Sequence, residues 1–345
     1  MQIYKYVIKI SKFADMKKIT SLFLLIVILF SACETEFNVN ADWEEVTVVY
    51  GLLDQNQDKQ YIRINKAFLG DEDAFVMASV ADSINYNPNN LEVKIEKVSA
   101  SGNVLGSIVI TDTIHVKKDS GMFSVDENII YVFDTDNFLN EEKEYKLTIT
   151  NKLTGNVVSS ETNLINELTF PLSMNFDADF GFISSLTGDY LSKTIAWNHS
   201  KNAAIYQMTL LVNYIEYGTD GSIDTQTVQK VYPVIDNLTN LSQKITGEEF
   251  LNLLSSVKED PTVNKRVVDD LDLLFSVGTA DLNTYINLNE PPTGIVQERD
   301  LYTNIDGGIG LFSARYNKYQ NNIDITITTK QAIADSLGYL KFDYP

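Results

Sequence analysis

Carboxylates are the side chains in this chain best suited to acid–base chemistry. They occur in four close groups: Asp71, Glu72 and Asp73; Asp134 and Asp136; Asp177 and Asp179; Asp269, Asp270 and Asp272. A glycosidase needs two such carboxylates at a set separation, which spacing along the chain does not supply. The groups occupy predicted turns and strand ends, so we interpret them first as solvated side chains. A glycan-acting hydrolase that uses paired carboxylates is kept as the alternative.

A partial calcium-loop pattern occurs at Asp54, Asn56 and Asp58. A complete loop of this type has glycine at its sixth position and glutamate at its twelfth. Lys59 and Asn65 stand at those two positions. The pattern therefore favours an ordinary polar turn over a calcium site.

Histidine and cysteine are too few for the common metal and nucleophile chemistries. The chain has only His115, His199 and Cys33, and the two histidines are not spaced like zinc ligands. There is no Gly-x-Ser-x-Gly sequence and no phosphate-binding loop, although sequence order alone does not exclude a histidine-assisted serine. We therefore predict a non-enzymatic protein with no catalytic residue, metal or cofactor.

The single cysteine, Cys33, closes a segment that resembles a bacterial lipoprotein signal peptide. Lys17 and Lys18 give its basic start, residues 21–30 its apolar core, and Ser31 and Ala32 the small residues before the cut. The apolar run is too short for a membrane-spanning helix, which needs about 20 residues. The resemblance implies cleavage before Cys33 and lipidation of its thiol.

The leader sets the expected boundaries at the start of the chain. Residues 1–32 would be the signal peptide and 33–42 a polar tether. Residues 1–15 fit no part of a signal peptide, so Met16, rather than Met1, is an alternative start. A lipid anchor predicts an outer-membrane lipoprotein of the cell envelope, and its periplasmic or surface orientation is left open.

Composition narrows the partners of the remaining chain. The 345 residues carry a net charge of −20, and removal of the leader, with its five lysines and one acid, makes the charge more negative. Nucleic acid and anionic membrane surfaces are poor partners for such a charge. The length suggests two domains, and frequent tyrosine and phenylalanine favour a mainly β fold.

An immunoglobulin- or fibronectin-like β-sandwich is predicted over residues 43–165. Short extended segments separated by turns are typical of this fold, and residues 74–81 are the one stretch there with a weak helical pattern. The spacing of Leu139 and Tyr145 resembles the tyrosine corner of such sandwiches, in which the tyrosine hydroxyl bonds back to the preceding loop. An ordinary strand with a surface tyrosine is the alternative.

A second β-rich, sandwich-like domain is predicted over residues 170–345. Trp197 ends a predicted strand and is expected in the core, because Ile195 lies on the same face. Residues 246–258 predict a helical insertion with Thr246 as its N-cap. A second short helix is predicted at residues 331–337.

Residues 289–298 and 302–315 are similar to the C-terminal signature of an uncharacterised family of Bacteroidota envelope lipoproteins, a domain of unknown function. The asparagine, the paired glycines and Gly-Leu-Phe-Ser carry the resemblance. It implies an envelope lipoprotein and no catalytic residue. Gly307, Gly308 and Gly310 predict a tight backbone approach beside a buried Phe312; a backbone-lined ligand site is the alternative.

The expected function is the binding or scaffolding of a partner protein or glycan at the outer membrane. An outer-membrane TonB-dependent transporter is a candidate partner, because loops on rigid sandwiches are common binding surfaces. A purely structural component of a surface assembly is a further alternative.

Overall fold

The computed structural model describes residues 45–67, 84–117, 127–289 and 301–344. Over these ranges the chain is mainly β, with three sheets and a few short helices. Cys33, the leader, the tether and the weak helical pattern at residues 74–81 lie outside the described residues. None of the helices in the described ranges has the length and apolar character that crossing a membrane requires.

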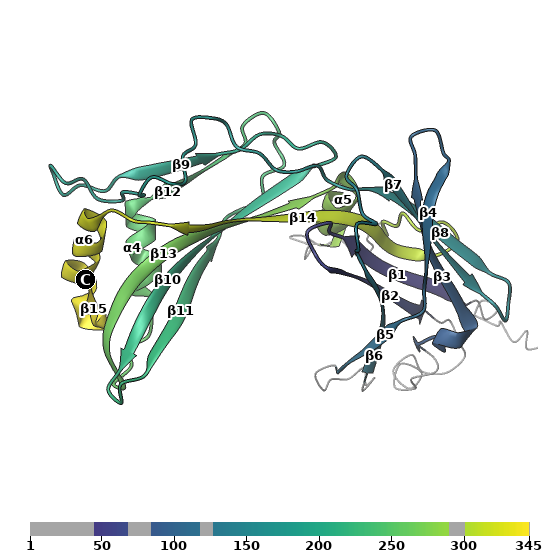
Figure 1. The fold of residues 1–345 in the computed structure, drawn as a ribbon, viewed down its shortest axis with the longest axis horizontal. Coiled ribbons are helices and arrows are strands. Elements are labelled where there is room, and N and C mark those ends of the chain that lie inside the picture. The colour runs from purple at the N-terminus through teal and green to yellow at the C-terminus, as the bar shows by residue number, and fades with distance from the viewer. Residues whose placement is uncertain (1–44, 68–83, 118–126, 290–300, 345) are drawn as a thin grey trace, which may run out of the picture. The chain divides into compact units, whose positions relative to one another are not determined.

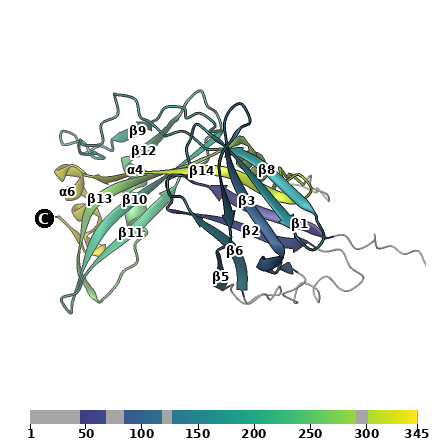
Figure 2. The same cartoon turned by 45° about the vertical axis from the view of Figure 1, so that its right-hand side comes forward.

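The N-terminal part is a β-sandwich of the immunoglobulin-like type. One layer contains four strands in the order β1-β2-β6-β5, and the other contains β4-β3-β7-β8. Figure 2 labels all four strands of the first layer and β3 and β8 of the second. Their bounds are β1 Val46–Leu53, β2 Lys59–Ala67, β3 Leu91–Val98, β4 Val104–Ile110, β5 Thr113–Lys117, β6 Glu127–Asp134, β7 Glu144–Asn151 and β8 Val157–Asn163, with a 3-10 turn, η1, at Pro88–Asn90.

Alternating burial along the strands builds the core between these layers. In β2, Ile62 and Ile64 are buried while Tyr61 and Arg63 are exposed. In β7 every second residue from Tyr145 onward is buried. A period of two places one set of side chains on each face of a sheet, so the sequence pattern is sufficient to form this core.

Tyr145 forms the predicted tyrosine corner. The ring is fully buried, and its hydroxyl accepts a hydrogen bond from the Asn140 backbone N–H at 2.5 Å and donates to the Phe138 carbonyl at 3.1 Å. Leu139, also buried, lies in the same core. Burial raises the pKa of Tyr145 to about 12, so the hydroxyl stays protonated and able to donate at neutral pH.

The C-terminal part is also β-rich, and three of its strands, β10, β13 and β14, are 14 to 16 residues long. They are β9 Ser192–Ala196, β10 Ile205–Gly218, β11 Ile223–Val231, β12 Ser242–Thr246, β13 Val263–Gly278, β14 Ile309–Ile323 and β15 Phe342–Asp343. The helices are α4 Gly247–Ser255, α5 Ala280–Asn289 and α6 Ile327–Leu337, followed by the 3-10 turn η2 Gly338–Leu340.

The core of the C-terminal part lies on one face of β10 and β13. Trp197 is 4% exposed and packs edge-on against Phe275 at a ring distance of 5.3 Å, as expected for a core residue. α4 covers the same core through Phe250, which stacks on Phe182. Thr246 caps α4 in a capping box with Glu249, so the sequence pattern gives this helix and its start correctly.

β14 joins the two parts into one nine-stranded sheet. It pairs antiparallel with β13 and parallel with β1, so the strand order runs β11-β10-β13-β14-β1-β2-β6-β5, with β15 beside β13 (Figure 1). Ile305, Phe312 and Ala314 consequently belong to the core of the N-terminal sandwich. No local sequence pattern predicts that residues beyond 300 contribute to the core of the N-terminal sandwich.

Gly307, Gly308 and Gly310 permit the close approach of β14 and its preceding loop to β1. Gly310 has a φ of +119°, and a Cβ there would collide with the Val49 carbonyl of the neighbouring strand. Gly307 has a φ of +72°, and a Cβ on Gly308 would lie 2.7 Å from the Thr47 carbonyl. The tight backbone approach beside a fully buried Phe312 is therefore present.

Candidate ligand-binding cavity

A cavity of about 290 Å³ lies between α5 and the nine-stranded sheet, called the long sheet below. It is on the face of this sheet that is turned away from the C-terminal core. Strands β1, β10, β13 and β14 supply its floor, and α5 supplies a wall. Its lining is mostly apolar with a few polar groups, which is the usual make-up of a small-molecule site. The lining residues are Leu52, Ile205, Tyr206, Gln207, Val234, Ser276, Val277, Gly278, Leu282, Ile286, Arg315 and Asn317.

Two cross-strand rows form the floor. Gln207, Ser276 and Asn317 are direct neighbours on β10, β13 and β14 and make a polar row. The row two residues along each strand consists of Ile205, Gly278 and Arg315. Because the intervening residues on each strand face the core, both rows are on the opposite face of the sheet.

Helix α5 is attached to the sheet at its start. The buried hydroxyls of Thr279 and Ser313 are hydrogen-bonded at 2.5 Å, and Thr279 Oγ1 also accepts from the Leu282 N–H at 3.4 Å. Further along the helix, Tyr285 packs edge-on against Tyr50 of β1 at a ring distance of 6.0 Å. These contacts place Leu282 and Ile286 over the floor.

Gly278 lets the helix come this close. A Cβ on Gly278 would lie 2.9 Å from Ile205 Cγ1 and 3.0 Å from Leu282 Cδ2. Both distances are shorter than ordinary van der Waals contact. The missing side chain at this position therefore sets the spacing between the floor and the α5 wall.

Arg315 is the cationic group of the cavity lining, and it forms a loose ion pair with Asp54. The Nε atom lies 3.7 Å from Asp54 Oδ2, and the arginine side chain is 48% exposed. Asp54 is buried and accepts hydrogen bonds from the Asn56 N–H at 3.0 Å and from Asn317 Nδ2 at 3.1 Å. Burial raises the pKa of Asp54, and these three partners oppose the rise.

The partial calcium pattern forms a polar turn. Asp54 accepts from the backbone of Asn56 and Gln57, which closes the turn between β1 and β2. Asp58, Asp134 and Asp136 line a shallow polar pocket of about 370 Å³ beside this turn. Within the described ranges, no group of three or more histidine, cysteine or acidic side chains is arranged to hold a metal ion.

Asp270 and Asp272 lie close enough to share one hydrogen-bond donor. Both accept from one amide nitrogen, Asn213 Nδ2, at 2.7 and 2.9 Å, and Asp272 also accepts from the Asn322 N–H. Burial raises the pKa of Asp270, as do the neighbouring carboxylates Asp272, Asp269 and Asp324, while Asn213 lowers it. This pair does not line the cavity.

The other residues considered from the sequence have separate places. Asp177 and Asp179 are exposed, while Asp71, Glu72 and Asp73 lie outside the described residues. His115 lies in β5, and His199 lies in a loop with its Nδ1 3.1 Å from the Tyr206 hydroxyl. Among the described residues, Asp177, Asp179, His115 and His199 do not line the cavity.

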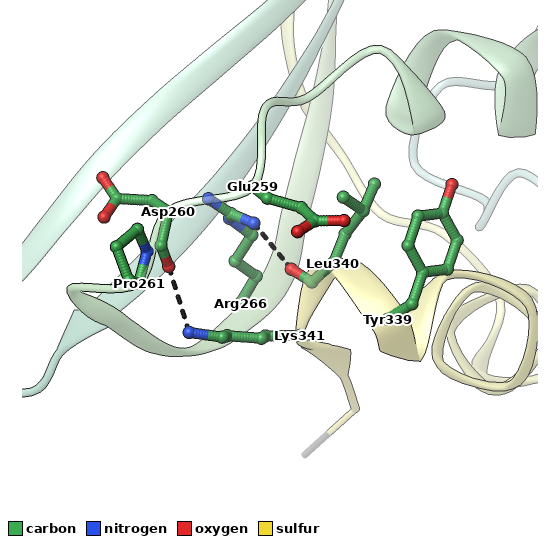
Figure 3. Close-up of a pocket in the computed structure, with 7 residues that line it drawn as sticks. All are labelled: Glu259, Asp260, Pro261, Arg266, Tyr339, Leu340 and Lys341. Atoms are coloured by element: carbon green, nitrogen blue, oxygen red, sulfur yellow. Dashed lines mark hydrogen bonds between the residues drawn. The ribbon is translucent and has the colours of Figure 1, made fainter.

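A second, smaller cavity of about 140 Å³ surrounds Arg266, which is only 2% exposed (Figure 3). Its guanidinium donates to Glu216 at 2.7 Å and to the carbonyls of Leu340 and Lys258 at 2.6 and 3.1 Å. A buried charge with such partners is satisfied within the protein. The arrangement fixes η2 to the start of β13, which is a structural role.

The cavity residues do not stand out in the sequence. Gln207, Ser276 and Asn317 are isolated polar residues in strands far apart along the chain, and no short motif links them. The one usable signal is the alternation of polar and apolar residues in β10, which marks Gln207 as facing away from the core.

Comparison with known proteins adds no family and no function. No protein-family model matches the chain, and no curated protein matches it. Among solved structures, the chain is similar to the four N-terminal Ig domains of Dscam1 isoform 4.44, with 11% identity and a TM-score of 0.15. That match covers 70% of this chain and half the length of the other. A likeness this distant carries no argument about what the protein does.

Proposed function

We propose that this protein is a lipid-anchored component of the bacterial cell envelope that binds a partner through its β framework without catalysing a reaction. The anchor rests on the resemblance of residues 16–33 to a lipoprotein signal peptide. The family resemblance of residues 289–298 and 302–315 agrees with the same location. The preferred partner is a protein of the outer membrane, such as a TonB-dependent transporter, and a glycan is the alternative.

One structural observation carries the binding proposal. The outward face of β1-β2-β6-β5 contains a row of directly paired residues, Tyr50, Arg63, Ile130 and Ile114. Tyr50 and Ile114 are 40% and 39% exposed. Grouped exposed apolar side chains on one face of a soluble domain commonly mark an interaction site.

This face, here called the outer row face, also includes exposed Tyr61 of β2 and Val116 of β5. It continues to the cavity, because Tyr50 contacts Tyr285 of α5 and Leu52 of β1 lines the cavity floor. Tryptophan, tyrosine and arginine are enriched among the hot-spot residues of protein–protein interfaces. The mixture of Tyr50, Tyr61 and Arg63 therefore favours a protein partner.

The hydrolase alternative has less support. Asp270 and Asp272 are close, as two catalytic carboxylates must be, but both are bonded to the Asn213 amide. They lie apart from the cavity, where a sugar ring would be enclosed. A purely structural role in a surface assembly would use the same outer row face. It differs from the binding proposal in two predictions: the protein should be abundant, and its loss should change the integrity of the envelope.

The anchor is tested by labelling cells with radioactive palmitate. Wild type and a Thr35→Ala control should incorporate label equally, and Cys33→Ala should incorporate none. Equal labelling of Cys33→Ala would refute the anchor. Protease shaving of intact cells, run in parallel, reports whether the protein faces the surface.

The binding proposal is tested by cross-linking in native membranes followed by affinity purification. The wild-type chain should recover a defined outer-membrane protein, and the double variant Tyr50→Ser, Ile114→Ser should lose it. Ile223→Ser on β11, which removes a side chain that is 67% exposed, is the matched control and should retain the partner. Loss of the partner in the control alone would contradict the assignment to the outer row face.

A further inference from the structure

We propose that the cavity between α5 and the long sheet binds a small molecule with an apolar body and a single carboxylate, which Arg315 recognises. None of the residues that define the outer row face lines this cavity, so its test does not depend on the identity of the protein partner. Four features of the cavity lead to this class of ligand.

The apolar part of the lining sets the body of the ligand. Leu52, Ile205, Val234, Leu282 and Ile286 provide aliphatic walls on both the sheet and the α5 sides. The volume of about 290 Å³ corresponds to roughly ten water molecules at liquid density, which suits a short acyl chain or a single aromatic ring. Displacing water from such walls favours binding of apolar groups.

The charge of the lining is the opposite of the charge of the protein. The chain has 47 acidic against 27 basic residues, yet the lining contains one arginine and no aspartate or glutamate. A cationic ligand would therefore find no carboxylate at the cavity surface. An anionic group would meet Arg315 there, since the carboxylate paired with Arg315, that of Asp54, is buried and does not line the cavity.

Arg315 has donors available for such a group. A guanidinium carries five N–H donors in a fork that matches a carboxylate. Within the described part of the chain, Arg315 Nε lies 3.7 Å from Asp54 Oδ2, which is longer than a hydrogen bond. Asp54 keeps its bonds from Asn56 and Asn317 if Arg315 turns toward a ligand.

The polar row gives the carboxylate a second set of contacts. Ser276 lies between Gln207 and Asn317 and carries the hydroxyl of this row, which is next to the row that contains Arg315. A hydroxyl can donate to the carboxylate oxygen that Arg315 does not hold. The apolar walls and the polar row thus orient one end of the ligand toward β14.

The test uses three eight-carbon probes that share a body and differ in the head group: octanoate, 1-octanol and octylammonium. Binding is measured by isothermal titration calorimetry on the full chain with Cys33→Ala, which removes the lipid site and leaves every described residue unchanged. We expect octanoate to bind about tenfold more tightly than octanol. We expect octylammonium to bind more weakly than both.

Variants separate head-group recognition from the apolar cavity. Arg315→Gln should abolish the preference for octanoate over octanol while octanol binding stays the same. Ile286→Trp, which fills the space under α5, should weaken both probes. Lys244→Gln, which removes an exposed cation on β12 that does not line the cavity, is the matched control and should bind the probes like the parent chain.

The outcomes decide the proposal. Equal affinity of the parent for octanoate and octanol, or an unchanged preference in Arg315→Gln, would overturn recognition by Arg315. No octanoate binding at millimolar concentration would overturn the site itself. Near-ultraviolet circular dichroism of each variant ensures that a loss of binding is not a loss of folding. Because neither lipidation nor the protein partner enters this assay, its failure leaves those proposals to their own tests.

Discussion

The side chain of Asn304 pairs with the backbone of Phe312 as a neighbouring strand would. Its Nδ2 donates to the Phe312 carbonyl at 2.7 Å, and its Oδ1 accepts from the Phe312 N–H at 2.9 Å. The Asn304 carbonyl in turn accepts from Ser160 Oγ at 2.7 Å. Asn304 therefore links its loop to β14 through its side-chain amide and to β8 through its backbone carbonyl, at the point where Phe312 enters the sandwich core.

Replacing Asn304 with alanine should destabilise the protein. The change removes the hydrogen-bond partner of the Phe312 N–H and of the Phe312 carbonyl, and both bonds are partly buried. The free energy of unfolding should therefore fall by about 2 kcal/mol. Urea denaturation followed by fluorescence measures the loss. Asn287→Ala, which removes an exposed asparagine contact on α5, is the control and should change the midpoint little.

Replacing Gly310 with alanine should be more damaging. Its φ of +119° is unfavourable for any L-residue with a side chain, and the added Cβ would overlap the Val49 carbonyl in β1. We expect a loss of about 4 kcal/mol or failure to fold, because two adjacent backbones would have to separate.

Gly338→Ala is the matched control for this glycine. Gly338 has an ordinary helical φ of −57°, and a Cβ there meets no atom within 4 Å. Its thermal midpoint should stay the same or rise. If both alanine variants unfold at the same temperature, the close approach of β14 to β1 is not important for stability.

Replacing Tyr145 with phenylalanine isolates the hydroxyl of the tyrosine corner. The ring stays in the core, but the bonds to the Asn140 N–H and the Phe138 carbonyl are lost. We expect the free energy of unfolding to fall by about 1–2 kcal/mol. Tyr61→Phe, whose side chain is 48% exposed, should be neutral in the same equilibrium unfolding experiment.

Asp270 should make stability fall as pH rises above the unfolded pKa of an aspartate. Burial raises its pKa in the folded state, with the nearby Asp272, Asp269 and Asp324 adding to the rise. Between the two pKa values the folded protein binds more protons than the unfolded chain. The free energy of unfolding therefore falls from about pH 4 until the folded pKa is passed, and it stays at the lower value above that pH.

Asp270→Asn removes this titration and keeps an oxygen able to accept from Asn213. The variant should be more stable than the parent at neutral pH, and the difference between them should shrink as pH falls toward 4. Urea unfolding at a series of pH values measures both. A difference that stays constant across the series would show that Asp270 does not titrate as proposed.

Local patterns in the sequence were enough for much of the fold. Alternation placed Ile62 and Ile64 in the core, the capping box set the start of α4 at Thr246, and the spacing of Leu139 and Tyr145 marked the corner. These features depend on neighbours within a few residues, so their physical causes can be read along the chain. The mainly β class with an immunoglobulin-like sandwich follows from the same signals.

Tertiary structure alone decided which distant strands are neighbours. The parallel pairing of β14 with β1 brings residues separated by more than 250 positions into one sheet and puts Phe312 in the first core. The antiparallel pairings of β10 with β13 and of β13 with β14 align Gln207, Ser276 and Asn317. The position of β14 beside β1 places Arg315 near the buried Asp54. Strand register across such separations depends on the packing of the whole sheet, and no local preference encodes it. The sequence by itself therefore determined the strands, the helix cap, the corner and the expectation of a lipid on Cys33, while the cavity and its charge exist only through long-range pairing.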